Sequence, residues 1–301
     1  DKAAQQLNSE IPDIHERTGS QLVASFTASK IRWLADNEKT NAERVAAIAL
    51  PHDWLSWQLS GAKNLNSLFT DRSDASGTGY FDSVKNEYCR DIFAAALRSQ
   101  REVVLPKIIA PNSFGGETSK GIPIAAGAGD NAGAALGLGA GVGDLVISLG
   151  TSGTAFAVSS SSTHDPSGEV AGFADATGNF LPLACTLNAA KIFNTVATTL
   201  GISFEEFSSL ALNAPAGAEG LRIIPHFDGE RTPNRPDATG VFSGMTLENS
   251  NPADIARAMI EGMLAGLADA VQALIDLGVE VKRVLIIGGA AKNPAVGQIA
   301  S

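Results

Sequence analysis

The sequence is poor in the residues that build metal sites and disulfide frameworks. Its 301 residues include only two cysteines, Cys89 and Cys185, and four histidines. The cysteines fall in segments that read as helix and strand, which is typical of buried thiols in a reduced intracellular protein. The histidines form no H-x-x-x-H or Cys/His spacing, so the sequence predicts no protein-ligated metal.

Positive charge and long apolar runs are also scarce. Lys and Arg number 22 against 32 Asp and Glu, which gives a formal net charge of −10. Because such a field repels phosphate, we expect no binding to nucleic acid or to an anionic membrane surface. The sequence has no basic-plus-apolar leader and no uninterrupted apolar run of transmembrane length, so we expect no membrane partner and a cytoplasmic location.

What is present indicates a globular α/β protein of two domains. The chain is 44% hydrophobic, and its 31 glycines and 13 prolines follow no period. Strand-like apolar runs alternate with amphipathic helical patterns, which predicts an α/β fold with at least two layers. The expected strands are residues 122–126, 144–149, 154–158, 221–225 and 281–287. The expected helices include residues 26–34, 41–59 with an interruption at Pro51, 187–200 and 252–277.

Residues 70–80 are small and polar throughout. One interpretation is a helix start followed by a surface loop, and the other is a loop that faces a substrate. Several polar residues elsewhere are assigned to packing or to the surface, among them His52 and His226. Glu230 and Arg231 either reach a ligand or form an internal salt bridge that fixes their loop.

A glycine-rich turn follows the first of the apolar strands, at residues 127–131 (GAGDN). A strand end places the carboxylate of Asp130 at the rim of a sheet, and its small neighbours allow a ligand close to the backbone. Such a carboxylate can accept the proton of a hydroxyl that attacks phosphorus. The alternative is that Asp130 caps the helix that follows.

Two further turns could receive a nucleotide. Residues 150–153 (GTSG) form a predicted hairpin tip with consecutive N–H groups and two hydroxyls, which could hold phosphate oxygens or be an ordinary tight turn. Residues 288–294 (GGAAKNP) form a passage from strand to helix where a nucleotide could lie against bare backbone. Neither the dinucleotide fingerprint G-x-G-x-x-G nor the P-loop pattern is present, so a Rossmann or Walker site is not supported.

Taken in order, these turns resemble successive motifs of the FGGY family of carbohydrate kinases. The motifs are residues 127–131, 148–153, 229–233, 240–246 and 287–291. Upstream segments at residues 26–30, 50–55 and 73–78 look like those of the xylulokinase branch of the family. The resemblance spans almost the whole chain.

The resemblance implies two actin-like, ribonuclease-H-like domains with an active site in the interdomain cleft. Residues 1–122 would be the remainder of an amino-terminal sugar-binding domain, which is incomplete. Residues 123–301 would be a carboxy-terminal nucleotide-binding domain, truncated at its end. The family also has an amino-terminal strand with an acidic residue, a Gly-Thr-rich phosphate turn and a Met-His-type sugar segment. These are not found here, so as an entire gene product the chain would be expected to lack kinase activity.

Roles carry over by position from the family's motifs. Asp130 matches the catalytic base, and Asp130 and Asn131 match sugar-binding positions. The positions that match the phosphate-facing and adenosine-contacting turns are Gly150, Thr151 and Ser152, then Gly289, Ala290 and Asn293. ATP and Mg²⁺ are the implied cofactors, with the Mg²⁺ held mainly by phosphate oxygens and water.

The reaction that the resemblance implies is the ATP-dependent phosphorylation of a ketopentose, D-xylulose to D-xylulose 5-phosphate. The alternatives are a kinase of the same fold for ribulose, gluconate or glycerol, and a non-catalytic sensor of sugar or nucleotide. A nicotinamide oxidoreductase would lack its fingerprint. The expected partners are a small-molecule sugar and MgATP. The oligomeric state that remains open beside the monomer is a homodimer.

Overall fold

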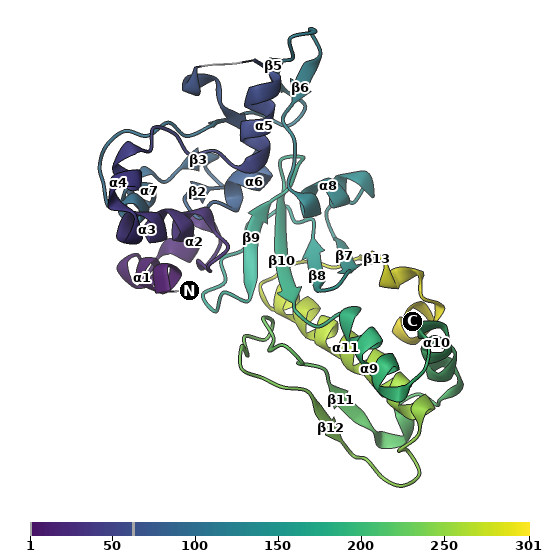
Figure 1. Ribbon diagram of the computed structural model, residues 1–301. Coiled ribbons are helices and arrows are strands. Elements are labelled where there is room, and N and C mark those ends of the chain that lie inside the picture. The colour runs from purple at the N-terminus through teal and green to yellow at the C-terminus, as the bar shows by residue number, and fades with distance from the viewer. Residues whose placement is uncertain (1, 62–63) are drawn as a thin grey trace. The chain divides into compact units, whose positions relative to one another are not determined.

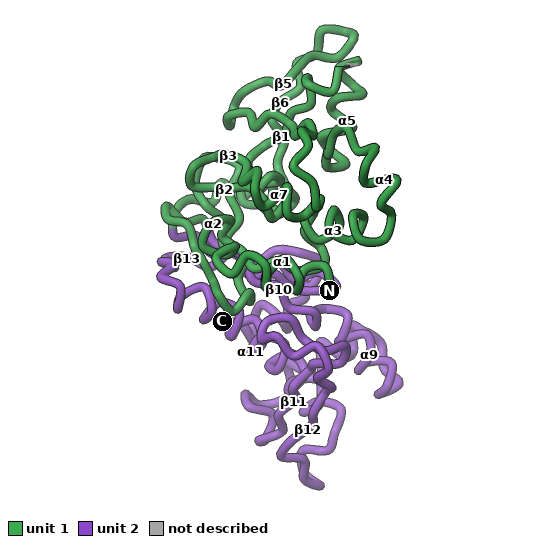
Figure 2. The backbone as a smooth tube through the Cα atoms, turned by 90° about the vertical axis from the view of Figure 1, so that its left-hand side faces the viewer, with its two compact units in different colours: residues 1–142, 158–182 green, residues 143–157, 183–301 purple. Residues whose placement is uncertain are grey.

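The computed structural model describes residues 2–61 and 64–301 (Figure 1). The chain divides into two compact units, which Figure 2 distinguishes by colour. Unit 1 comprises residues 1–142 and 158–182, and unit 2 comprises residues 143–157 and 183–301. The division expected between residues 122 and 123 falls inside unit 1, because the strand that begins at Pro123 pairs with residues 114–117 of the same unit.

Unit 1 consists of short helices and small two-stranded sheets. Its helices are α1 (Lys2–Glu10), α2 (Ile14–Thr18), α3 (Thr27–Asn37), α4 (Lys39–Arg44), α5 (Pro51–Leu59), α6 (Arg72–Ser76), α7 (Arg90–Leu97) and α8 (Asp130–Gly137), with a 3₁₀ turn, η1 (Leu65–Ser67). Strand β1 (Phe69–Thr70) runs parallel to β4 (Lys107–Ile108). Antiparallel pairs join β2 (Phe81–Asp82) to β3 (Glu87–Tyr88) and β5 (Phe114–Glu117) to β6 (Pro123–Ala125).

The core of unit 1 forms where α1, α3 and α7 pack together. Leu7, Ile31 and Phe93 are among its buried side chains, and the ring of Tyr80 meets that of Phe93 edge-on at a centroid distance of 5.2 Å. Burying such apolar surface stabilises a domain by roughly 25 cal/mol per Å². The amphipathic pattern that begins near Phe26 is confirmed as α3.

Two expectations for unit 1 were wrong. The helix expected over residues 41–59 is two helices, because residues 45–50 are extended and Pro51 begins α5. The helix start expected within residues 70–80 is confirmed as α6, but the segment is not a surface loop. The segment includes the whole of α6, whose residues Arg72, Ser73 and Ser76 are buried together with the preceding Asp71.

Unit 2 is built around strands β7 (Asp144–Leu149), β8 (Gly153–Ala157), β10 (Phe180–Thr186) and β13 (Arg283–Ile287). Their order is β13-β7-β8-β10, with β13 parallel to β7 and the other pairs antiparallel. The expected hairpin between residues 149 and 153 is thereby confirmed. Residues 180–182, at the start of β10, belong to unit 1, as does the neighbouring strand β9 (Val170–Ala174).

Helices complete unit 2. They are α9 (Lys191–Leu200), α10 (Phe204–Asn213), α11 (Pro252–Asp276) and α12 (Pro294–Ala300), with two 3₁₀ turns, η2 (Ala218–Gly220) and η3 (Ala290–Lys292). A small antiparallel pair joins β11 (Arg222–Ile224) and β12 (Val241–Ser243). The expected strands at residues 122–126, 221–225 and 281–287 are thus confirmed, each slightly shortened.

The long helix α11 organises the core of unit 2. Asn251 caps its start, since its side-chain oxygen accepts the N–H groups of Ala253 and Asp254, each at 3.1 Å. Met259, Met263 and Leu267 of α11 belong to one buried apolar cluster that also contains side chains of α9 and α10. Within the described residues, α11 is the helix long and apolar enough to cross a membrane by length and composition, a test that the core helix of a soluble protein also passes.

Candidate functional site

The two turns expected to face a nucleotide lie side by side at one edge of the unit 2 sheet. Strands β7 and β13 are parallel neighbours in which Ser148 is paired with Ile287, so their carboxyl ends meet at the same edge. Gly288 adopts φ +97°, and a Cβ built on it would lie 2.4 Å from the carbonyl oxygen of Leu149. This close approach of two backbones requires glycine at position 288.

The first turn presents its polar groups outward. The N–H of Gly150 donates to the carbonyl oxygen of Ser152 at 3.1 Å, which closes the tip of the hairpin. Gly150, Thr151 and Ser152 are all exposed. Two hydroxyls and adjacent N–H groups at a sheet edge suit phosphate oxygens, so the composition of this turn fits its expected role.

The second turn is held by the side chain of Asn293. Its Oδ1 accepts the N–H of Ala295 at 2.9 Å, which caps α12, and its Nδ2 donates to the hydroxyl of Ser208 on α10 at 2.7 Å. Asn293 is only 6% exposed, whereas Gly289 is exposed and a Cβ on it would have open space around it. Ala290, expected as another adenosine contact, is buried at the start of η3. The open surface of this turn is therefore the backbone at Gly289.

In unit 1, Asp130 is the first residue of α8, and Gly129 occupies the N-cap position. Oδ1 of Asp130 accepts the backbone N–H of Asn131 at 2.8 Å and its side-chain Nδ2 at 3.1 Å. The carboxylate is exposed and lies in the first turn of a helix, where the helix dipole favours negative charge. Asp130 and Asn131 thus share a hydrogen bond. The carboxylate of Asp130, which would accept the proton, is not enclosed by the residues of unit 1.

A polar cluster lies behind this turn that sequence reasoning missed. Asp71 Oδ2 and Asp53 Oδ1 lie 3.5 Å and 3.0 Å from Nε2 of His52, and Asp74 bonds Nδ1 on the other edge of the ring. Asp53 is 1% exposed and Asp71 is 4% exposed. His52, which we had assigned to packing or the surface, therefore pairs with carboxylates from α5 and from the start of α6. Residues 50–55 and 73–78 had been noted as motifs, but their contact depends on folding.

The surroundings of this cluster shift the pKa values of His52 and Asp53. The hydrogen bond that Nδ1 of His52 donates to Asp74, aided by the other carboxylates, raises the pKa of His52 above its usual value, although burial opposes the charge. Burial raises the pKa of the Asp53 carboxyl. The ligand atoms of His52, Asp71 and Asp74 lie within 4.8 Å of one another, as a cation site would require. The raised pKa of His52 favours the protonated ring, which competes with a metal for the same nitrogens.

Glu230, in the third of the family-like motifs at residues 229–233, holds its loop from the buried side. It is 5% exposed, and its carboxylate accepts the N–H of Leu187 at 2.5 Å and Nδ2 of Asn188 at 3.0 Å. The backbone N–H of Arg231 donates to the same carboxylate at 2.8 Å. Glu230 therefore fixes the loop, but it does so by accepting N–H groups and not through the expected internal salt bridge, which is absent from the ion pairs of the described residues.

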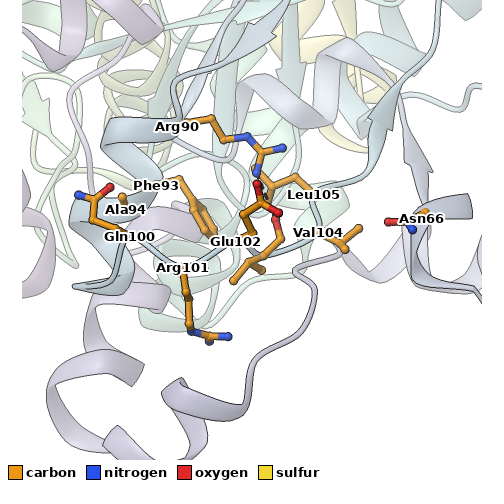
Figure 3. Close-up of a pocket in the computed structure, with 10 residues that line it drawn as sticks. Asn66, Arg90, Phe93, Ala94, Gln100, Arg101, Glu102, Val104 and Leu105 are labelled. Atoms are coloured by element: carbon orange, nitrogen blue, oxygen red, sulfur yellow. Dashed lines mark hydrogen bonds between the residues drawn. The ribbon is translucent and has the colours of Figure 1, made fainter.

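A cavity of about 700 Å³ in unit 1 contains none of the predicted site residues (Figure 3). Arg90 and Arg101 line it together with Glu102. Both guanidinium groups are engaged by backbone carbonyls, Arg90 by that of Val103 and Arg101 by those of Val45 and Ala42. The arginines therefore support the surrounding loops, and the cavity offers no separate chemistry.

Comparison with known proteins gives the family of the chain. Residues 2–137 match the N-terminal domain of the FGGY family of carbohydrate kinases, and residues 145–301 match its C-terminal domain. A xylulose kinase of Streptomyces coelicolor is 40% identical over 289 residues, which cover 93% of this chain and 57% of that protein. The chain thus spans little more than half the length of this relative.

Solved structures show the same relationship. The crystal structure of xylulose kinase from Bifidobacterium adolescentis superposes with a TM-score of 0.89 at 41% identity, covering 99% of this chain and 69% of that one. Gluconate kinase from Lactobacillus acidophilus, at 24% identity, shares the fold with a TM-score of 0.86, covering 100% of this chain and 64% of that one. The fold is the actin-like, ribonuclease-H-like fold of the sugar kinases. With both of its domains matched, this chain belongs to the FGGY family of carbohydrate kinases.

Proposed function

We propose that this chain carries the catalytic base and the nucleotide turns of a D-xylulose kinase, which transfers the γ-phosphoryl group of MgATP to the C5 hydroxyl of the sugar. The observation that carries the proposal is the identity of 40% to a xylulose kinase over 93% of the chain. The glycine-rich turns support it, because they present exposed backbone and hydroxyls at the positions that match the family's motifs.

In the proposed mechanism Asp130 accepts the proton of the attacking hydroxyl. The sugar oxygen forms a bond to the γ-phosphorus as the bond from phosphorus to the bridging β,γ-oxygen breaks, and ADP leaves with that electron pair. Asn131, whose Nδ2 donates to Asp130, would contact the sugar beside the base. The carboxylate is exposed, so a sugar hydroxyl can reach it, as a base requires.

The unit 2 edge would bind the nucleotide. Gly150, Thr151 and Ser152 would meet the phosphates, and the turn of Gly289, Ala290 and Asn293 would meet the adenosine. The fit is supported by the exposed hydroxyls of the first turn and by the open space at Gly289. Because the first turn offers hydroxyls and backbone rather than carboxylates, Mg²⁺ would be held chiefly by the phosphates and water that accompany it.

The test is Asp130→Asn in the complete protein that contains this chain. An ADP-release assay with D-xylulose should lose at least about 10³-fold in kcat, while calorimetry finds the ATP affinity changed less than about threefold. Asn131→Ala serves as the matched neighbour and should chiefly raise the KM for the sugar. Turnover of Asp130→Asn at the wild-type rate would refute the base assignment.

The choice of sugar is the finer part of the proposal. Ribulose, gluconate and glycerol kinases are the alternatives of the same chemistry, and gluconate kinase is a structural neighbour. A panel of these acceptors in the same assay should give D-xylulose the highest kcat/KM. ADP release with none of them, despite ATP binding, would favour a non-catalytic sensor.

The cellular location and the oligomeric state of the enzyme are also part of the proposal. The net charge of −10 favours a free cytoplasmic protein that acts on small molecules over one bound to nucleic acid or membrane. Light scattering on the complete protein tests for a homodimer.

A further inference from the structure

The turn that ends in Asp130 rests on a set of side chains that no sequence motif assigned to it. We name His52, Asp71, Ser73 and Asp74 the platform. Ser73 and Asp74 belong to α6, Asp71 is its N-cap, and His52 lies on α5. All of these, and the turn at residues 127–130, belong to unit 1. The platform is separated from the turn by more than fifty residues of chain.

A hydrogen-bond relay connects the platform to the backbone beside Asp130. Oδ1 of Asp71 accepts the N–H of Ser73 at 2.7 Å and that of Asp74 at 3.1 Å, as an N-cap should. It also accepts the Ser73 hydroxyl proton. With its proton directed to Asp71, the Ser73 oxygen presents a lone pair to the N–H of Gly129, which donates to it at 2.9 Å. The orientation of the hydroxyl is therefore fixed by a buried carboxylate.

The glycines of the turn are matched to the platform in shape. A Cβ on Gly129 would lie 2.8 Å from Oδ1 of Asp74, a distance too short for a side chain. Gly127 adopts φ +87°, and a Cβ there would meet the ring of His52 at 3.7 Å. The turn thus lies directly on the platform, and Asp130 is the next residue along the chain.

Charge pairing holds the platform itself in place. Asp74 accepts a hydrogen bond from Nδ1 of His52, and Nε2 of the same ring lies between the carboxylates of Asp53 and Asp71. The other anchor is Ser76 of α6, whose hydroxyl accepts the N–H of Ala174 on β9 at 3.1 Å. Helix α6 is therefore held by hydrogen bonds at both ends, and its first turn cannot move without breaking buried hydrogen bonds.

We propose that Ser73 and Asp71 are positioning residues for the phosphoryl-transfer reaction, acting through the N–H of Gly129 to aim the carboxylate of Asp130 at the acceptor hydroxyl. This inference rests on the proposed role of Asp130 as the base. Loss of one bond to Gly129 frees the backbone dihedrals of the residue before the base. A displacement of about 1 Å in such a group lowers turnover by up to about 10²-fold.

The experiment compares Ser73→Ala with Ser76→Ala in the complete protein. Both variants remove a buried serine hydroxyl that accepts a backbone N–H, and both serines lie on α6, but only Ser73 is bonded to the turn of Asp130. We expect Ser73→Ala to lower kcat about 10- to 100-fold with the KM for ATP unchanged, and Ser73→Thr to restore most of it. Ser76→Ala should keep kcat within about twofold, with a similar fall in melting temperature.

The outcomes separate this inference from the function on which it rests. Wild-type kcat in Ser73→Ala, or equal kcat losses in both alanine variants, would overturn the positioning role while Asp130→Asn remained inactive. Active Asp130→Asn would instead overturn the proposed function. Should Ser73→Ala be recovered unfolded, Ser73→Cys retains the shape with a weaker acceptor, and wild-type kcat in that variant would equally overturn the inference.

Discussion

Two adjacent glycines at the end of β13 allow the structural role of this turn to be separated from its proposed role in adenosine binding. Gly288 has φ +97°, and its Cβ would lie 2.4 Å from the carbonyl oxygen of Leu149. Gly289 has φ −61° and ψ −43°, which suit any residue, and its Cβ would meet no atom within 4 Å. Gly288→Ala and Gly289→Ala therefore add the same methyl group in opposite surroundings.

The expected loss of stability in Gly288→Ala follows from two terms. A left-handed conformation disfavours alanine by about 1–2 kcal/mol, and forcing a methyl against a backbone oxygen adds about 1–3 kcal/mol. We expect a loss of about 3 kcal/mol in the free energy of unfolding, which lowers the melting temperature by roughly 9 °C in a domain of ~150 residues. Gly289→Ala should match the wild type or exceed it by up to about 1 kcal/mol.

Calorimetric titration with ATP then tests the proposed contact. If the nucleotide lies against the bare backbone at Gly289, the methyl group of Gly289→Ala should weaken ATP binding about tenfold, or ~1.4 kcal/mol, in a fully folded protein. Denaturant unfolding and titration are measured on the same samples. Wild-type stability in Gly288→Ala would refute the close approach of the two turns, and wild-type ATP affinity in Gly289→Ala would refute the nucleotide contact.

Other predictions concern unit 1. Arg72 donates to the carbonyl oxygens of Asn179 and Ser83 beside the buried carboxylate of Asp175, so Arg72→Met should lower the free energy of unfolding by about 3 kcal/mol, and a loss under 1 kcal/mol in urea melts would contradict this. The bidentate pair of Arg17 and Asp91 is solvent-exposed, so Arg17→Ala should cost less than about 1 kcal/mol, and still less in 1 M salt. Because the pKa of His52 is raised by Asp74, the stabilisation from its protonated form is complete below the ordinary value of 6.5 and is lost as pH rises through the folded pKa. Stability measured from pH 6 to pH 9 should therefore fall less steeply in His52→Gln, and an identical slope would show that His52 does not titrate in this range.

Local sequence signals predicted the elements that carry the turns. The hairpin of β7 and β8 follows from two β-rich runs around residues 150–153, and α11 follows from Pro252 near its first turn and Gly278 beyond its end. The two turns proposed for the nucleotide could be picked out because each is a glycine-rich segment directly after an apolar strand. Their adjacency needed only parallel pairing of β7 with β13.

The remainder depended on contacts between residues distant in the chain. The polar segment at residues 70–80 reads as a helix start with a surface loop, since nothing local shows that Arg72 is satisfied by the carbonyl of Asn179, 107 residues away. The interruption of the helix at residues 45–50 results from an extended pairing of Ala47 with Val104. His52 has no local spacing that signals a partner, so its carboxylate neighbours emerge only from the packing of α5 against the start of α6.

The proposed phosphoryl transfer depends most on the carboxylate of Asp130. A crystal structure of the complete protein with D-xylulose and a non-hydrolysable ATP analogue measures its position directly. We predict a carboxylate oxygen within about 3 Å of the C5 hydroxyl, with the γ-phosphate at the turn of residues 150–152. A sugar bound with its C5 hydroxyl out of hydrogen-bonding reach of Asp130 would contradict the account.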